Sequence, residues 1–420
     1  MQRFLDTCSY FLAVAVAASF VLPIPVNSLL IILFLATTLL RFSYPVFKQN
    51  ARSYPVLLFS VLLFILVLAG WLLSNNKNEA WLFAERKLSL VIFPVAFLIL
   101  PSFSSKQLLT ILRAYVLSVV IACLYMVSLA AISFFFFNAN SDVFFYHNLS
   151  EGIHFNAIYL SMYCLFGCVF TLSHQLFNKS APVVFIFLTF CIVLLSSKMV
   201  IALFLLVSLS YLILKIGLSV RFKITAALFT LLSFVIIIGF TPFLQQRFLA
   251  EIKSDKNVIT KDKFVYNTPF SGATLRTVIW RHSLSILSEK KAWLTGVGTG
   301  DFQQLLNEKY EKSGMYMGNP SLGDSGYRGY NPHNQYIEFV LSQGLLGLLC
   351  WILWIIWLWA KTISGNHFAF AMLLLAVCFL NMTECFLSAN KGVVWFVFFC
   401  SLFVVNNKIQ TNSNKQLSSP

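Results

Sequence analysis

Long apolar runs separated by short polar segments dominate the chain. They recur at about 9–25, 27–42, 55–73, 87–101, 108–137, 154–173, 181–196, 199–216, 223–240, 345–361, 367–386 and 391–406. Most are long enough for a helix to cross the hydrocarbon core of a bilayer. The pattern therefore predicts an all-α polytopic membrane protein with about twelve transmembrane helices.

One long polar segment, residues 241–344, interrupts the pattern between the ninth and tenth runs. Its apolar spacing predicts a helix over 273–287, and Asp301 is expected to cap a second helix over 302–312. The predicted organisation is transmembrane helices 1–9 in 1–240, a partly helical loop with catalytic elements in 241–344, transmembrane helices 10–12 in 345–406, and a disordered cytoplasmic tail in 407–420.

Composition and charge support this topology. The chain is 59% hydrophobic and 11% charged, whereas soluble domains carry roughly 25% charged residues. Basic residues concentrate in one set of short loops, including Arg41, Lys48 and Arg52. The positive-inside rule therefore predicts that both termini are cytoplasmic and that 241–344 faces outward. The net charge of +15 then reflects topology and not nucleic-acid binding.

The sequence lacks the motifs of several enzyme classes. It contains no HExxH, no P-loop, no nucleophile elbow and no Asp-x-Asp pair for a metal-bound sugar nucleotide. The nine cysteines lie in or beside the apolar runs, so they predict no disulfide framework. We therefore expect neither a metal nor an organic cofactor.

The stretch Asn331-Pro332-His333-Asn334 stands where the long polar segment meets an apolar run. Asn331 is predicted as the N-cap and Pro332 as the first helical residue. This would place His333 and Asn334 in a first turn whose free N–H groups attract an anion. A capped surface helix with a solvated His333 explains the stretch equally well.

Several cations fall on the same predicted outer side. Lys198 follows Ser196-Ser197 at a break between two apolar runs, where an unpaired charge is costly and often functional. Arg276 and Arg281 lie on the helix predicted over 273–287, and Arg328 lies in the polar segment after it. Alternatively, Lys198 is a turn residue that extends its ammonium to the membrane interface.

Other polar positions leave two interpretations open. Arg86 and Lys87 contact a diphosphate or anchor the chain at the membrane interface. His154 and Tyr159 stand at the outer end of the sixth run. They either form a polar lining that faces the outer compartment or only cap the span. The glycine-spaced turn from Gly296 to Asp301 is a tight connector or a phosphate-binding loop. The last two runs are joined on the outer side by Thr383-Glu384 and Asn390-Lys391-Gly392, which are interpreted as a solvated turn.

Taken in order, these motifs resemble the superfamily of O-antigen ligases and polymerases, polytopic glycosyltransferases, and within it sequences of Bacteroidota. The resemblance is carried by Glu85–Leu90, Leu195–Lys198, Gly296–Asp301, His333–Tyr336 and Gly344–Gly347. The long outer segment also precedes the third-last span, as in that superfamily.

The resemblance implies metal-independent, inverting transfer of a glycan from undecaprenyl diphosphate to an acceptor hydroxyl, which in ligases belongs to a lipid A–core sugar. The reaction would occur on the periplasmic face of a bacterial inner membrane. The essential Arg of the family falls on Arg276, its essential His on His333, and its Ser-Arg pair on Ser197-Lys198, where Lys replaces Arg.

The implied roles follow from these positions. Arg276 and Lys198 would stabilise the departing diphosphate, and His333 would position or deprotonate the acceptor. Further expected diphosphate contacts are Arg281, Asn334, Arg86 and Lys87. Secondary candidates are His154, Tyr159, Tyr336, Glu338 and Arg328.

Three alternatives remain. A polymerase of the same superfamily would pass the growing chain to another carrier-linked repeat, and a protein O-oligosaccharyltransferase would modify secreted proteins. A lipid-glycan transporter is the alternative from a different class, although the chain shows no internal repeat of the kind common in transporters. All of these would act among membrane lipids and on lipid-linked glycans.

Overall fold

The computed structural model describes residues 1–217, 219–240, 242–266, 268–319, 321, 323–365 and 367–406. The tail predicted over 407–420 lies outside the described residues. Within these ranges the chain is helical, and the sole β-type pairing is an isolated bridge between Asn319 and Asp324. The predicted all-α class is therefore confirmed for the described residues.

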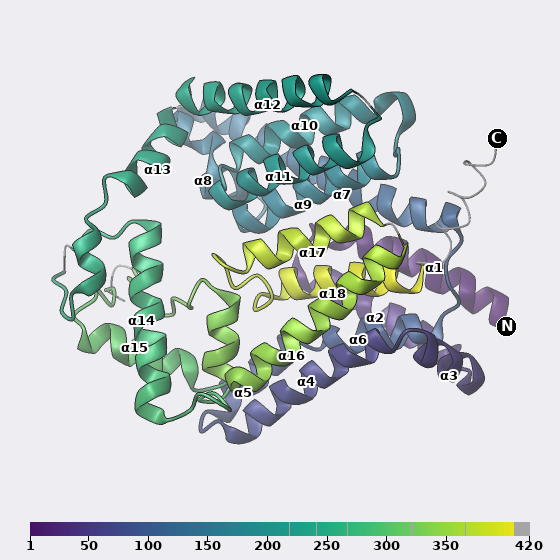
Figure 1. The fold of residues 1–420 in the computed structure, drawn as a ribbon, viewed down its shortest axis with the longest axis horizontal. Helices are drawn as coiled ribbons and strands as arrows, with labels where there is room; N and C mark the ends of the chain where they lie inside the picture. The colour runs from purple at the N-terminus through teal and green to yellow at the C-terminus, as the bar shows by residue number, and fades with distance from the viewer. Residues whose placement is uncertain are drawn as a thin grey trace.

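The molecule consists of a large helical bundle and a smaller helical unit at one end of it, here called the larger and the smaller layer (Figure 1). The helices of the larger layer come from two parts of the chain. The first part contains α1 (Gln2–Ser19), α2 (Ile24–Leu40), α3 (Tyr44–Ser53), α4 (Pro55–Leu73), α5 (Lys77–Arg86), α6 (Ser89–Ile99), α7 (Ser105–Phe137), α8 (Tyr146–Glu151), α9 (Ala157–Ser173), α10 (Ala181–Leu194), α11 (Lys198–Lys215) and α12 (Val220–Phe240). The second part contains α16 (Gln335–Gly365), α17 (Phe368–Leu380) and α18 (Asn390–Val405).

The smaller layer lies at one end of this bundle (Figure 1). It consists of α13 (Pro242–Ile252), α14 (Gly272–Lys290) and α15 (Phe302–Lys312), with a short 3-10 turn at Lys256–Thr260. The helices expected over 273–287 and 302–312 are therefore present. Their apolar faces form a core of their own, which also includes Val67 of α4, Phe83 of α5 and Leu341 of α16. This shared core fixes the smaller layer to the ends of three bundle helices.

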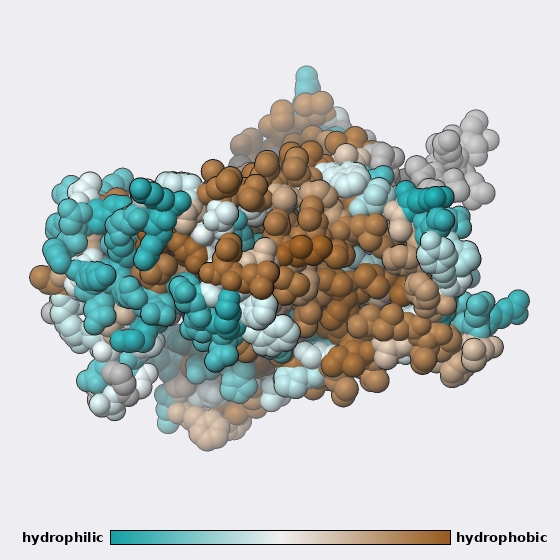
Figure 2. Space-filling model, turned by 90° about the horizontal axis from the view of Figure 1, so that it is seen from below, coloured by the Kyte–Doolittle hydropathy of each residue, from teal (hydrophilic) through white to brown (hydrophobic). Residues whose placement is uncertain are grey.

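The apolar surface of the bundle fits a membrane protein. Figure 2 shows a broad hydrophobic belt, with hydrophilic residues gathered at the end that carries α14 and α15. Among the described residues, α4, α7, α11 and the Gln335–Ile363 part of α16 are each long and apolar enough to cross a bilayer. The pair α2 and α3 would make a fifth span, bent by 114°. Helices occupy all twelve predicted runs, while the number that cross the membrane stays a prediction.

A break in α16 joins the two layers. At Gly344 the backbone has φ +71° and ψ −172°, so the helix stops and resumes in a new direction. The segment before Gly298 fills the break: Val297 N–H donates to Leu341 O at 2.9 Å, and Leu345 N–H donates to Trp293 O at 2.8 Å. Hydrogen bonds lost within the helix are thus replaced by bonds to the loop.

Replacing Gly344 with alanine is expected to destabilise the fold by at least about 2 kcal/mol. The residue needs a positive φ, and an added Cβ would lie 2.1 Å from the Leu294 carbonyl oxygen. Thermal unfolding of the purified protein in detergent measures the change. Gly239→Ala is the matched control, because its Cβ would meet nothing within 4 Å. Equal melting temperatures for the two variants would contradict the interpretation.

Candidate functional site

Arg276 and His333 meet at the carboxylate of Glu384. Arg276 Nη2 lies 2.9 Å from Glu384 Oε1, and His333 Nδ1 lies 3.2 Å from Glu384 Oε2. The Glu384 side chain is only 11% exposed, while those of Arg276 and His333 are 27% and 30% exposed. The two residues singled out by sequence therefore flank one partly buried carboxylate. The interpretation of Glu384 as a solvated turn residue is wrong.

The turn that carries His333 is fixed from both sides. Trp280, one turn beyond Arg276 on α14, donates its indole N–H to Pro332 O at 2.9 Å. On the other side, Gln335 N–H donates to Asn381 O at 2.8 Å. These bonds hold the His333 segment between α14 and the end of α17.

The predicted start of α16 is wrong by three residues. The helix begins at Gln335, and Asn334 is its N-cap: Asn334 Oδ1 accepts the N–H groups of Tyr336 at 3.0 Å and Ile337 at 3.1 Å. His333 precedes the cap with φ +46°, and its own N–H donates to Asn331 Oδ1. The N–H groups expected to attract an anion are thus already bonded, and Asn334 serves as a cap.

A second ion pair lies next to Arg276. Lys198 Nζ contacts Glu251 Oε1 at 2.8 Å, and Glu251 Oε2 accepts the N–H of Ala273 at the start of α14. A Cβ on Gly272 would lie 3.0 Å from Glu251 Oε1 and 3.3 Å from Arg276 Nη1, so the two side chains border the same small gap. Burial raises the pKa of Glu251, but hydrogen bonds from Lys198 and Ser271 lower it more, and the net shift is downward.

The segment that follows Glu384 is fixed by buried polar contacts. Lys87, 2% exposed, donates to Leu387 O at 2.6 Å, and Gln335 Oε1 accepts the Leu387 N–H at 2.9 Å. Tyr159 donates its hydroxyl to Cys385 O at 3.2 Å. Glu338, 1% exposed, contacts Ser388. These contacts hold the chain that follows Glu384 in place. The described residues that make them form no hydrogen bond with Arg276 or His333.

Residues 183–352 match the protein-family model described as O-antigen ligase. This range contains Lys198, Arg276 and His333. Over these residues the chain is similar to the O-antigen ligase family. No curated protein matches the chain.

The remaining residues predicted for this O-antigen ligase-like site lie elsewhere. Arg281 donates to Ile259 O and lies 3.7 Å from Asp262, in a separate 290 Å³ pocket. Arg86, His154 and Arg328 are exposed on other segments. Tyr336 donates its hydroxyl to Cys378 O at 2.8 Å. The diphosphate roles predicted for Arg281, Arg86 and Lys87 thus find no support in this arrangement.

Two acidic residues of the cluster, Glu251 and Glu384, were missed by sequence reasoning. Each lies in a short polar stretch without a recognisable motif, and each acquires its cation only through the fold. Within the described residues no three His, Cys, Asp or Glu side chains gather as metal ligands.

His282, on α14, makes the smaller layer sensitive to acid. It is 7% exposed, and its Nε2 has no hydrogen-bond partner among the described residues. Burial lowers the pKa of His282 from 6.5 to about 4, and the Arg281 and Lys309 cations act in the same direction. Between these values the unfolded chain binds the proton and the folded chain does not, so folding stability falls as the pH drops from 6.5 to about 4.

We expect the melting temperature to fall by several degrees between pH 7 and pH 4.5, and His282→Gln to lose part of that dependence. Thermal unfolding at a series of pH values measures both. An unchanged pH dependence in His282→Gln would assign the acid sensitivity to other groups.

Proposed function

We propose that this protein is an inverting glycosyltransferase that moves a glycan from undecaprenyl diphosphate to an acceptor hydroxyl on the periplasmic side of a bacterial inner membrane. The match of residues 183–352 to the O-antigen ligase family supports glycosyl transfer between lipid-linked substrates. The observation that carries the proposal is the Glu384 carboxylate shared by Arg276 and His333.

His333 is suited to accept the proton of the acceptor hydroxyl. A carboxylate only accepts hydrogen bonds, so the contact with Glu384 requires the ring proton on Nδ1. In the neutral ring this tautomer leaves the other nitrogen, Nε2, without a proton. As the acceptor oxygen attacks the anomeric carbon, its proton passes to Nε2 and the imidazolium remains paired with Glu384. The histidine and carboxylate thus act as a base and its positioning residue.

Arg276 is suited to stabilise the departing diphosphate. In the absence of substrate its charge is compensated by Glu384, and that of Lys198 by Glu251. When His333 gains a proton, Glu384 is compensated by the imidazolium instead. The Arg276 guanidinium then becomes available as negative charge grows on the leaving lipid diphosphate. Proton uptake and leaving-group stabilisation are thereby coupled through one carboxylate.

Lys198 would add a second positive charge next to Arg276. Its ammonium provides charge without the two-pronged geometry of a guanidinium, so its contribution is electrostatic and not shape-specific. Lys198→Arg is accordingly expected to retain activity, which a transfer assay checks.

A ligase passes the glycan to a lipid A–core sugar, and we favour this acceptor. The second candidate is a polymerase, which the same family match supports. A lipopolysaccharide gel of a deletion strain separates them. A ligase mutant loses every long-chain band and accumulates polymer on the carrier, whereas a polymerase mutant retains core carrying a single repeat unit.

Purified protein tests the activity itself. We expect glycan transfer from an undecaprenyl-diphosphate-linked donor to continue in the presence of a chelator. Transport of the donor across vesicles without transfer would assign the protein to a different class.

A further inference from the structure

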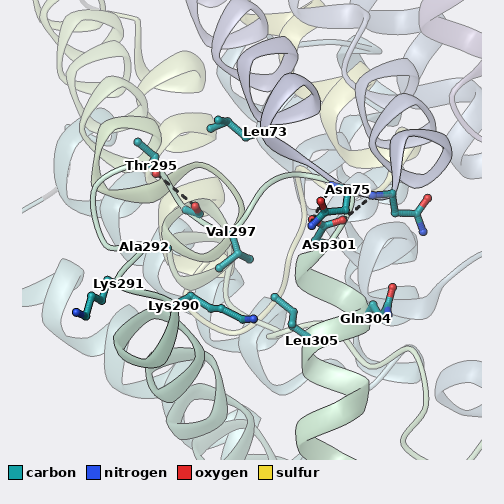
Figure 3. Close-up of a pocket in the computed structure, with 12 residues that line it drawn as sticks. Leu73, Asn75, Lys290, Lys291, Ala292, Thr295, Val297, Asp301, Gln304 and Leu305 are labelled. Carbon is teal, nitrogen blue, oxygen red and sulfur yellow. Dashed lines mark hydrogen bonds between the residues drawn. The ribbon is translucent and has the colours of Figure 1, made fainter.

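A pocket of about 440 Å³ lies at the far end of α14 from the Arg276–His333 cluster (Figure 3). Its walls come from the α4–α5 turn, the end of α14, the turn at Thr295–Val297 and the start of α15. Fourteen residues of helix separate Lys290 from Arg276, which corresponds to roughly 21 Å at the rise of an α-helix. The pocket is thus separate from the proposed reaction centre.

The pocket combines a cation with neutral polar groups. Lys290 extends its ammonium toward Leu305 and the start of α15, while Lys291 extends away (Figure 3). Asn75, Asn76 and Gln304 also line the pocket. Its single carboxylate, Asp301, accepts the Asn75 N–H and Nδ2 and the Asn76 N–H at 2.8 to 3.0 Å. The lining thus holds two lysines against one carboxylate whose oxygens already accept three hydrogen bonds, and this net positive charge favours an anion.

The glycine motif forms the rigid floor of this pocket and does not bind phosphate through its backbone. Gly296 N–H donates to Ala292 O, Val297 N–H to Leu341 O, and Gly300 N–H to the Ser74 hydroxyl. A Cβ on Gly300 would lie 2.1 Å from Asn76 O. Gly298 and Gly300 are therefore required for close packing against the α4–α5 turn, and Gly296 for close packing against α16. Asp301 precedes α15 as predicted, but its side chain bonds the α4–α5 turn and makes no cap hydrogen bond.

Exposed apolar residues lie in or next to the segments that line the pocket. Leu72 and Leu73 end the candidate span α4 with 67% and 58% exposure, and Leu294, next to the pocket wall, is 60% exposed. Trp293 and Leu345 are also exposed, and the two are joined through the backbone. Large apolar side chains beside a lysine are the arrangement that proteins use at the headgroup level of a bilayer.

We propose that this pocket binds the phosphate of a membrane-lipid headgroup in the leaflet on the α14 side. The Lys290 ammonium would pair with the phosphate, the Asn75 and Gln304 side chains would bond headgroup hydroxyls, and the acyl chains would lie against Leu73 and Leu294. Such a lipid would hold the end of α14 at the membrane surface. The proposal is independent of the proposed transfer reaction.

Native mass spectrometry of the full chain in detergent tests this site with added phosphatidylglycerol and phosphatidylcholine. We expect tighter retention of phosphatidylglycerol, and we expect Lys290→Gln to weaken it roughly fivefold, as for one lysine near an anionic surface. Lys256→Gln removes the same charge from an exposed position outside the pocket and should leave retention unchanged. Equal retention of both lipids, or equal loss in both variants, would overturn the proposal.

Competition identifies the source of the phosphate. Displacement of phosphatidylglycerol by a phosphorylated glycolipid, with the same loss in Lys290→Gln, supports the pocket and assigns it to a glycolipid headgroup. Equally effective displacement by inorganic phosphate would show that the acyl chains contribute nothing, and it would overturn the assignment to a membrane lipid.

Discussion

His333→Ala is expected to lower the rate of glycan transfer by roughly 10²–10⁴-fold, the usual contribution of a general base. The ring accepts the proton of the attacking hydroxyl in the proposed reaction, and no other imidazole contacts Glu384 among the described residues. The measurement is turnover of a carrier-linked donor by purified protein, with the fold checked by thermal unfolding.

Two further variants separate a base from a structural role. Added imidazole should partly restore transfer in His333→Ala, because a small base can occupy the vacated space. Glu384→Gln should reduce transfer at least about tenfold while His333 is still present, since the amide no longer compensates an imidazolium. Full activity of a folded His333→Ala protein would refute the assignment.

Arg276→Ala is expected to lower transfer by roughly 10²–10³-fold, comparable to the loss of one group that stabilises transition-state charge. Arg276→Lys should recover only part of this rate, because an ammonium cannot replace a two-pronged guanidinium. The same transfer assay measures both, and a donor-saturation curve shows whether the loss lies in the chemical step.

Loss of Arg276 also removes one of the two partners of a carboxylate that is 11% exposed, so the single variant is expected to be less stable. The double variant Arg276→Ala with Glu384→Gln eliminates that unpaired charge. It should regain stability without regaining transfer. Recovery of transfer in the double variant would show that Arg276 serves only to neutralise Glu384.

Much of the fold could be predicted because membrane helices depend on a local property. Apolar runs long enough to span a bilayer coincide with helices along the whole described chain, and the helix over 273–287 follows from its apolar spacing. The break at Gly344 could not be located in this way. It depends on hydrogen bonds between α16 and a segment well before it in the chain, Trp293 to Val297.

The candidate site was predictable only in part. Arg276 and His333 were singled out as polar residues on the predicted outer side, and the resemblance assigned their roles. Glu384 stands alone in a turn and becomes a partner of both only when α17 and α14 are in place. The cap was misplaced for a local reason. Asn331 and Asn334 have the same capping chemistry, and the choice between them depends on the long-range bond from Gln335 to Asn381.

The break in α16, held by hydrogen bonds to the Trp293–Val297 segment, limits which substrates can react. The two halves of that helix cannot realign without losing the bonds that Val297 and Leu345 make across the gap. The His333 turn, just ahead of the first half, is therefore held at a fixed position relative to the apolar second half of α16. We expect the transfer rate to depend on the distance between the acceptor sugar and its lipid anchor. A sugar carried too near the anchor, or too far from it, would not reach the His333 turn.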